Sequence, residues 1–223
     1  MFEWEFNRDV TNRIKKILDK YSKIKVILTS PNDTDTSLAE RVRIAKDNHV
    51  DIFVSIHANA YGITWNTAHG WEIYIYEKYG KPLLLAEDIE KNSIPYLGLK
   101  DRGIKIGSSL YVINQTHKYG IPSVLIEHGF YTNKSELALL KSDDFREKCA
   151  IADAKGILQY LGIKWGEEEL AVTTTEVLID GKIYNVNRIL YNDKNYIELR
   201  SLEQAGFKID YKEGIPTIDS PKE

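Results

Sequence analysis

Residues 52 to 60 read Ile-Phe-Val-Ser-Ile-His-Ala-Asn-Ala, and this stretch decides how the fold is interpreted. It begins with an apolar run of strand length and turns polar towards its end, which is typical of a buried strand in a parallel sheet. His57 then stands at the carboxyl end of the strand, where open α/β sheets bind their ligands. A lone histidine is equally consistent with a hydrogen-bonded core side chain, so its position alone leaves both interpretations open.

A second stretch, residues 122 to 130, has the same form: Pro-Ser-Val-Leu-Ile-Glu-His-Gly-Phe. Glu127 ends this apolar run as His57 ends the first. Because the carboxyl ends of parallel strands meet at one edge of a sheet, the two side chains are expected to lie together. The pair therefore shifts the interpretation of His57 towards a functional site.

The composition limits the function classes. The chain has 223 residues, 43% of them hydrophobic, and a formal net charge of −3. This balance indicates neither nucleic acid nor an anionic membrane as a partner. Cys149 is the only cysteine, which excludes an internal disulfide and a cysteine-cluster metal site. No apolar run has the length of a transmembrane helix, and no signal peptide is expected at this N-terminus.

Alternating strand and helix patterns predict an α/β fold with a mostly parallel, twisted sheet flanked by helices. The segment from 99 to 107 is expected to be mostly loop. Helices are expected at 6–21, 37–48, 82–94, 133–140 and 145–161, and strands at 25–29, 52–57, 70–76, 109–114 and 123–127.

The composition changes after Gly162. We expect a catalytic domain over 1–162, a charged linker over 163–171, and a small β-rich α+β module over 172–223. Asp180-Gly181 between two β-like segments predicts a hairpin in this module.

A histidine and a glutamate at strand ends, with acids at the start of the first helix, indicate a partial zinc site. Catalytic zinc takes three protein ligands and leaves one position for water, and a further carboxylate acts as general base. This pattern would make Glu5 and His57 ligands and Glu127 the base. From spacing alone, Glu5 is better explained as a helix N-terminal acid favoured by the helix dipole.

The chain resembles the zinc-dependent N-acetylmuramoyl-L-alanine amidases of bacterial autolysins and phage endolysins, over residues 1 to about 162. The resemblance implies that His57 binds zinc and that Glu127 is catalytic. It also implies a ligating glutamate, matched best by Glu5 and less well by Glu3. The motifs that carry it are Ser55-Ile-His-Ala-Asn-Ala60, Ser37-Leu-Ala-Glu-Arg-Val-Arg-Ile-Ala45, Arg102-Gly-Ile-Lys105 with Leu110-Tyr-Val-Ile113, and Pro122-Ser-Val-Leu-Ile-Glu-His-Gly-Phe130 with Thr132-Asn133.

The mechanism that the resemblance implies is hydrolysis of the amide between N-acetylmuramic acid and L-alanine in peptidoglycan. Zinc would polarise the carbonyl and its bound water, and Glu127 would carry the water's proton to the leaving amine. Asn59 and Arg102 are candidates for substrate contacts, although turn-forming and ion-pairing roles explain them equally well. The implied location is the bacterial cell wall or the extracellular space, or the wall as the target of a phage lysis enzyme.

One departure from the family pattern concerns the metal. A strand with an Asp-Pro-Gly-His-Gly-Gly-like loop should precede Glu5, and its histidine is another zinc ligand. We therefore expect either an N-terminally truncated amidase or a zinc site that is lost or completed otherwise, with weaker zinc binding and an unfilled place in the sheet. The alternative function is an inactive, metal-deficient module that still binds peptidoglycan.

The C-terminal segment has a weaker resemblance of its own, to the small stalk-type domains related to the N-terminal domain of copper amine oxidases. Val177-Leu-Ile-Asp-Gly-Lys-Ile-Tyr-Asn-Val186 and Tyr196-Ile-Glu-Leu-Arg200 carry it. The module has no histidine, so no copper is inferred. Cell-wall attachment, spacing and a plain structural appendage all remain open for it.

Overall fold

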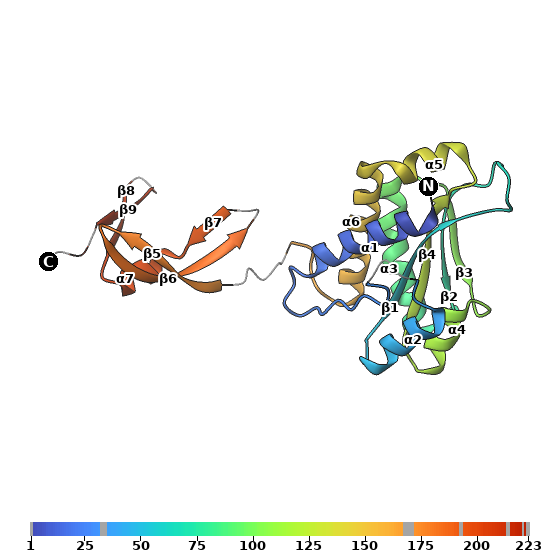
Figure 1. Cartoon of the computed structure of the whole chain (residues 1–223), viewed down its shortest axis with the longest axis horizontal. Helices are drawn as coiled ribbons and strands as arrows, with labels where there is room; N and C mark the ends of the chain where they lie inside the picture. The colour runs from blue at the N-terminus through green and yellow to red at the C-terminus, as the bar shows by residue number, and fades with distance from the viewer. Residues whose placement is uncertain are drawn as a thin grey trace. The chain divides into compact units, whose positions relative to one another are not determined.

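The computed structural model describes residues 2–31, 35–166, 172–191, 194–212, 215–219 and 221. The chain divides into two compact units, Met1–Glu167 and Glu168–Glu223 (Figure 1). Residues 167–171 of the expected linker lie outside the described residues. Among the residues that are described, no helix is long and apolar enough to cross a membrane.

The first unit is built on a four-stranded sheet in the order β1-β4-β2-β3. These strands are β1 (Phe53–Asn59), β4 (Ser123–Phe130), β2 (Trp71–Ile75) and β3 (Asp101–Ile106). The pairs β1–β4 and β2–β3 are parallel, whereas β2 and β4 run antiparallel. The α/β class is confirmed, and the sheet is mixed, with two of its three strand pairs parallel.

Helices cover both faces of this sheet (Figure 1). One face packs on α1 (Glu3–Leu18), α3 (Gly80–Leu97) and α6 (Asp143–Tyr160), and the other on α2 (Leu38–Asp47) and α4 (Tyr111–Lys118). The short α5 (Lys134–Lys141) precedes α6. The Ser37 side chain caps α2 by accepting a hydrogen bond from the Glu40 amide at 3.2 Å, as its capping-box spacing predicts.

Three predicted elements were wrong. Residues 25–28 lie in no strand, the segment from 99 to 107 contains β3, and the segment from 109 to 114 leads into α4. The first has the apolar pattern of a strand, but a strand also needs a hydrogen-bonding neighbour. The second is a short, charged edge strand, a composition that protects sheet edges and resembles a loop. In the third, tertiary packing of Val112, Ile113 and Thr116 overrides a β-branched composition.

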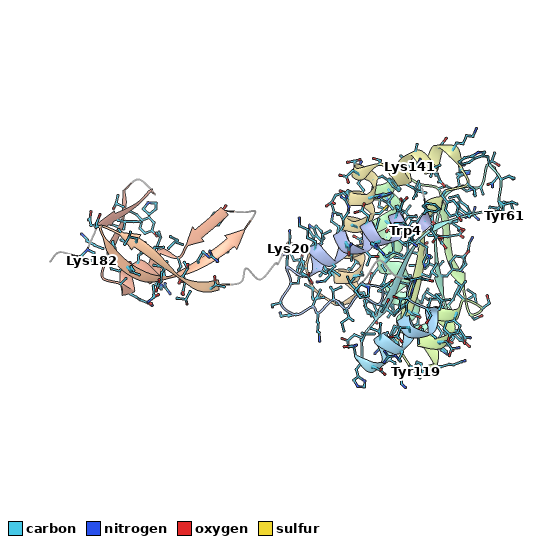
Figure 2. The ribbon with its side chains drawn as sticks, viewed as in Figure 1. Trp4, Lys20, Tyr61, Tyr119, Lys141 and Lys182 are labelled. Atoms are coloured by element: carbon cyan, nitrogen blue, oxygen red, sulfur yellow. The ribbon has the colours of Figure 1, made fainter. Side chains whose placement is uncertain are left out.

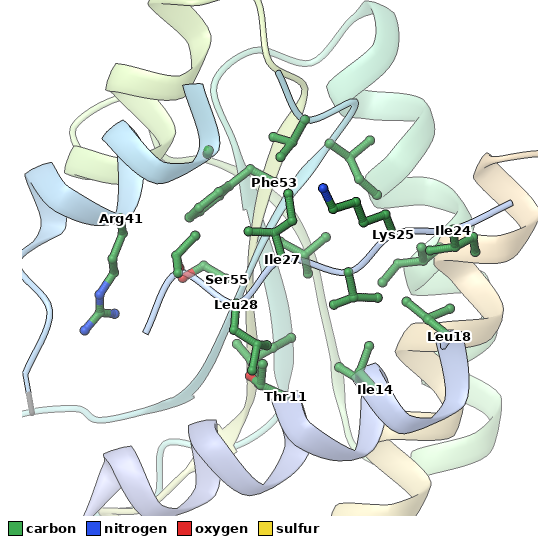
Figure 3. A pocket seen from close by; sticks show the side chains of 18 of the residues that line it. Thr11, Ile14, Leu18, Ile24, Lys25, Ile27, Leu28, Arg41, Phe53 and Ser55 are labelled. Carbon is green, nitrogen blue, oxygen red and sulfur yellow. The ribbon is translucent and has the colours of Figure 1, made fainter. Parts of the chain in front are cut away.

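A cavity of about 700 Å³ lies beside β1, the strand at one end of the sheet (Figure 3). Apolar side chains of residues 24–28, which are outside every strand, line it together with Phe53 of β1 and Ile14 and Leu18 of α1. β1 pairs with β4 only, so its other edge has no strand neighbour among the described residues.

Helices α3 and α6 pack closely at Gly156. A Cβ atom at this position would lie 2.4 Å from the Ile89 Cα and 2.9 Å from the Asp88 carbonyl oxygen. These are backbone atoms and cannot move aside, so any side chain at 156 would force the helices apart. The first unit therefore depends on glycine here.

We expect Gly156→Ala to destabilise the protein by about 1–3 kcal/mol, the usual cost of overpacking a core. Urea unfolding followed by circular dichroism measures this difference. Lys141→Ala, at an exposed position of α5, is the control and should change stability by less than about 0.5 kcal/mol. An unchanged midpoint for Gly156→Ala would show that the two helices are not held at this spacing.

The second unit has a small core of its own, formed by Val186, Leu202 and Phe207. Asp180 and Gly181 join its first two strands with φ angles of 51° and 76°, which confirms the predicted hairpin turn. Its elements are β5 (Val172–Ile179), β6 (Lys182–Tyr191), β7 (Lys194–Ile197), α7 (Leu199–Gln204), β8 (Lys208–Lys212) and β9 (Ile215–Asp219).

Candidate active site

His57 and Glu127 are directly paired across the parallel strands β1 and β4. Residues that face each other in a sheet project to the same side, so the two side chains share one face near the carboxyl ends of both strands. The expectation that these strands deliver them to one place is confirmed. The His57 side chain is 24% exposed, so solvent or a ligand can reach it.

Glu127 is held in a dry environment. Its Oε2 atom is buried and has no hydrogen-bond partner among the described residues. Burial raises the pKa of Glu127 to about 9, and the negative charges of Glu3 and Glu72 add to the effect. A buried carboxyl group with a raised pKa in a site is the property expected of a proton-transferring residue.

The Glu3 carboxylate is the closest acidic partner of His57. Its Oε1 atom lies 2.8 Å from His57 Nδ1, and the Asn7 side-chain amide donates to the same oxygen at 3.0 Å. The other ring nitrogen of His57, Nε2, lies 2.9 Å from the Ser55 hydroxyl. Burial acts to raise the pKa of Glu3, but the hydrogen bonds with His57 and Asn7 outweigh it and lower that pKa.

Glu5, the residue expected beside His57, makes a local contact instead. Its Oε2 atom accepts the Phe2 backbone N–H at 2.9 Å, so it caps the start of α1. The helical period explains the difference from Glu3. The buried stripe of α1 begins at Phe6 and Val10, and Glu3 lies three and seven residues before them on the same face. The apolar spacing of the helix therefore predicts that Glu3, and not Glu5, lies on the buried face of α1.

The described residues supply fewer donors than a catalytic zinc ion requires. His57 and Glu3 are two candidate ligands, whereas such sites take three protein donors. In the described part of the chain, no group of three His, Cys, Asp or Glu side chains is arranged to hold a metal. A complete zinc site therefore needs a donor from outside these residues.

Glu72 of β2 lies at the same level of the sheet as this pair and was missed by the sequence analysis. It is paired with Glu127 across β2 and β4 and is buried, with 2% of its surface exposed. Its Oε1 atom accepts hydrogen bonds from the Asn59 amide at 2.8 Å and from the Tyr74 hydroxyl at 2.6 Å. No sequence signal distinguishes Glu72, because only the order of strands in the sheet places it beside Glu127.

Two cations bind the other oxygen of Glu72. Arg102 Nε and Lys105 Nζ both donate to Oε2. Burial acts to raise the pKa of Glu72, but the hydrogen bonds from Lys105, Tyr74 and Arg102 outweigh it and lower the pKa. Asn59 and Arg102, the two expected substrate contacts, are thus both held by Glu72, and their contact with substrate stays a prediction.

His128 follows Glu127 and projects to the opposite face of β4, as strand alternation predicts. Its Nε2 atom lies 2.9 Å from Asp153 Oδ2, and its Nδ1 atom lies 3.3 Å from the His57 carbonyl oxygen. Both His128 and Asp153 are fully buried. His128 has a structural role, because its contacts tie β1 and β4 to α6.

Exposed aromatic side chains occur in the segments next to Glu3 and His57 in the sequence. Trp4 is 55% exposed at the start of α1, and Tyr61 is 70% exposed in the segment after β1 (Figure 2). Trp65, in the same segment, is 57% exposed and carries the Lys134 ammonium 5.7 Å from its ring centroid. Flat, exposed rings beside a site are suited to stack on sugar or peptide groups.

Comparisons with known proteins identify the family of this chain. The family model described as N-acetylmuramoyl-L-alanine amidase matches residues 1–159. An uncharacterized cell wall amidase of Bacillus anthracis is 38% identical over 167 residues, which cover 68% of this chain and 30% of the relative. The N-acetylmuramoyl-L-alanine amidase LytC of Bacillus subtilis is 36% identical over 162 residues, which cover 72% of this chain and 31% of the relative.

The chain spans roughly a third of the length of these two relatives. A solved structure, the catalytic domain of the N-acetylmuramoyl-L-alanine amidase CwlV from Bacillus (Paenibacillus) polymyxa, matches at 35% identity with a TM-score of 0.67. The match covers 73% of this chain and 87% of that one. Sequence and fold agree, and the chain belongs to the N-acetylmuramoyl-L-alanine amidase family.

Proposed function

We propose that the first unit hydrolyses the amide bond between N-acetylmuramic acid and the L-alanine of the stem peptide in peptidoglycan. The observation that carries the proposal is the pairing of His57 with the buried Glu127 at the carboxyl end of β1 and β4. Membership of the amidase family supports the same reaction.

In this reaction Glu127 acts as the general base. It takes a proton from the attacking water and passes it to the amine of L-alanine, whose bond to the lactyl carbonyl breaks. The buried carboxyl group holds the proton between these two transfers. Zinc, held by His57 and Glu3 with a donor from outside the described residues, would supply Lewis acidity at the carbonyl and a more acidic water.

Incubation of purified peptidoglycan with the chain and excess zinc tests the proposal. Hydrolysis would release primary amines, which an amine-reactive dye counts, in step with solubilised peptide. Reducing sugars should not increase, because no glycosidic bond is cut. Binding to the polymer with no amine released in excess zinc would refute the proposed hydrolysis.

A second candidate function is a peptidoglycan-binding module without hydrolytic activity. Its support is the count of two metal donors among the described residues. The exposed rings of Tyr61 and Trp65 would serve binding as well as catalysis. Both candidate functions predict that the chain sediments with peptidoglycan. Only the hydrolase is expected to release amines, so amine release distinguishes the two.

We also propose that the protein acts at the bacterial cell wall and that the second unit attaches the enzyme to the wall or spaces it from its anchor. Its separate core allows it to fold apart from the first unit. Residues 1–167 alone should retain amidase activity on soluble substrate and lose several-fold in the fraction that sediments with peptidoglycan. Equal sedimentation of the short and full chains would reduce the module to a structural appendage.

A further inference from the structure

A bulge in β3 brings two cations to the same side of the sheet. Strand β3 pairs with β2 at Trp71↔Asp101 and again at Ile73↔Ile104, so Arg102 and Gly103 together face the single residue Glu72. Gly103 has a φ of +75°, and its N–H donates to Asp101 Oδ1 at 2.7 Å. Such a bulge adds one residue to a strand and redirects the side chains beside it.

The bulge changes the direction in which Arg102 and Lys105 project. In a regular strand, residues three apart project to opposite faces. The extra residue of the bulge changes this alternation, and both cations reach the Oε2 atom of Glu72. The backbone bulge therefore brings Arg102 and Lys105, the cationic pair, together around the buried carboxylate of Glu72.

This cluster carries a net positive charge that a ligand can reach. Glu72 contributes one negative charge and is buried, whereas Arg102 and Lys105 contribute two positive charges with side chains 30% and 33% exposed. The Arg102 guanidinium also lies 4.9 Å from the Phe130 ring centroid, which restricts its orientation. Two fixed cations with one shared carboxylate leave one positive charge uncompensated.

The distance between the cationic pair and Glu127 indicates which part of a substrate could reach Arg102 and Lys105. Glu72 is paired with Glu127 on the neighbouring strand, and neighbouring strands lie about 4.8 Å apart. One residue of an extended peptide spans about 3.5 Å. A group one to two residues beyond a bond cleaved at Glu127 would therefore lie over the cationic pair.

We propose that Arg102 and Lys105, positioned by Glu72, form a subsite that binds a carboxylate of the substrate's peptide arm one or two residues beyond the scissile amide. The proposal rests on the amidase function proposed above. It assigns Glu72 as a positioning residue and the two cations as determinants of specificity. Arginine and lysine donors bind carboxylates through strong, charge-assisted hydrogen bonds.

The test uses two soluble muramoyl peptides. They differ only at the group one or two residues beyond the scissile amide, which is a carboxylate in one peptide and a carboxamide in the other. The wild-type chain with excess zinc should show a KM about 10- to 100-fold lower for the carboxylate, as expected for one charge-assisted contact, with similar kcat. Lys105→Met should lose most of this preference, and Lys105→Arg should retain it. Lys91→Met, which removes an exposed cation from α3 on the other face of the sheet, should behave as wild type.

Failure of the subsite and failure of the amidase function give different results. Hydrolysis of both peptides with equal KM by the wild-type chain, or an unchanged preference in Lys105→Met, would overturn the subsite and leave the amidase intact. If neither peptide is cleaved, calorimetry with the two peptides decides. Tighter binding of the carboxylate form that Lys105→Met abolishes supports the subsite, and equal binding refutes it. Lys105→Met should fold, because Arg102 still pairs with Glu72.

Discussion

Glu127→Gln is expected to lower the rate of amide hydrolysis by about 10²- to 10⁴-fold, the usual contribution of a general base. Glutamine has the shape of glutamate and carries no charge. It therefore fits the buried position of Glu127, where the Oε2 atom has no hydrogen-bond partner among the described residues. The variant should fold and bind zinc as the wild-type chain does, since its loss is confined to proton transfer.

The control for this variant is Glu87→Gln, an exposed position of α3 on the other face of the sheet. It removes the same charge without touching the site and should keep full activity. Rates are measured as amine release from peptidoglycan in excess zinc, with circular dichroism as the test of folding. Hydrolysis by Glu127→Gln within threefold of wild type would remove Glu127 from the mechanism.

The second large expected effect is weak binding of zinc by this chain. A full structural site, with four protein donors, binds zinc with about 10 kcal/mol or more. If each of the four donors contributes similarly, two donors leave about 5 kcal/mol, which corresponds to a Kd on the order of 0.2 mM. Calorimetric titration should therefore give weak binding by this chain, and tight stoichiometric binding would contradict the idea that a donor is missing.

The two acids at the start of α1 provide a matched pair for the same titration. Glu3→Gln and His57→Ala should each reduce zinc binding below detection, because each removes one of the two donors that meet at 2.8 Å. Glu5→Gln should bind zinc as wild type does, because Glu5 caps the helix. The reverse result for Glu3 and Glu5 would restore the assignment that the sequence pattern suggested.

Strands β1, β2 and β4 could be predicted because their apolar patterns are local. Apolar runs that end in His57 and Glu127 mark two buried strands, and the parallel pairing of β1 and β4 places the two side chains together. The α1 helix was equally clear from its apolar spacing. The rotation of α1 about its own axis was misjudged, and this rotation decides whether Glu3 or Glu5 faces the site.

Other features depended on contacts that a sequence pattern does not contain. Residues 25–28 have a strand's composition but line a cavity beside β1, where no strand pairs with them. Glu72 alternates with apolar neighbours in β2 as many solvent-facing residues do, and only the sheet order places it beside Glu127. The β3 bulge needs the register of β2 and β3, which the sequence of Arg102-Gly103 alone does not give.

The central claim is that His57 and Glu127 form the site of an amidase that cuts between sugar and peptide. Mass spectrometry of peptidoglycan fragments released by the chain in excess zinc tests it most directly. The predicted products are stem peptides with a free N-terminal alanine and glycan strands with intact lactyl carboxylates, both absent with Glu127→Gln. Release of disaccharide-linked peptides, or of free alanine peptides in equal amount by Glu127→Gln, would contradict it.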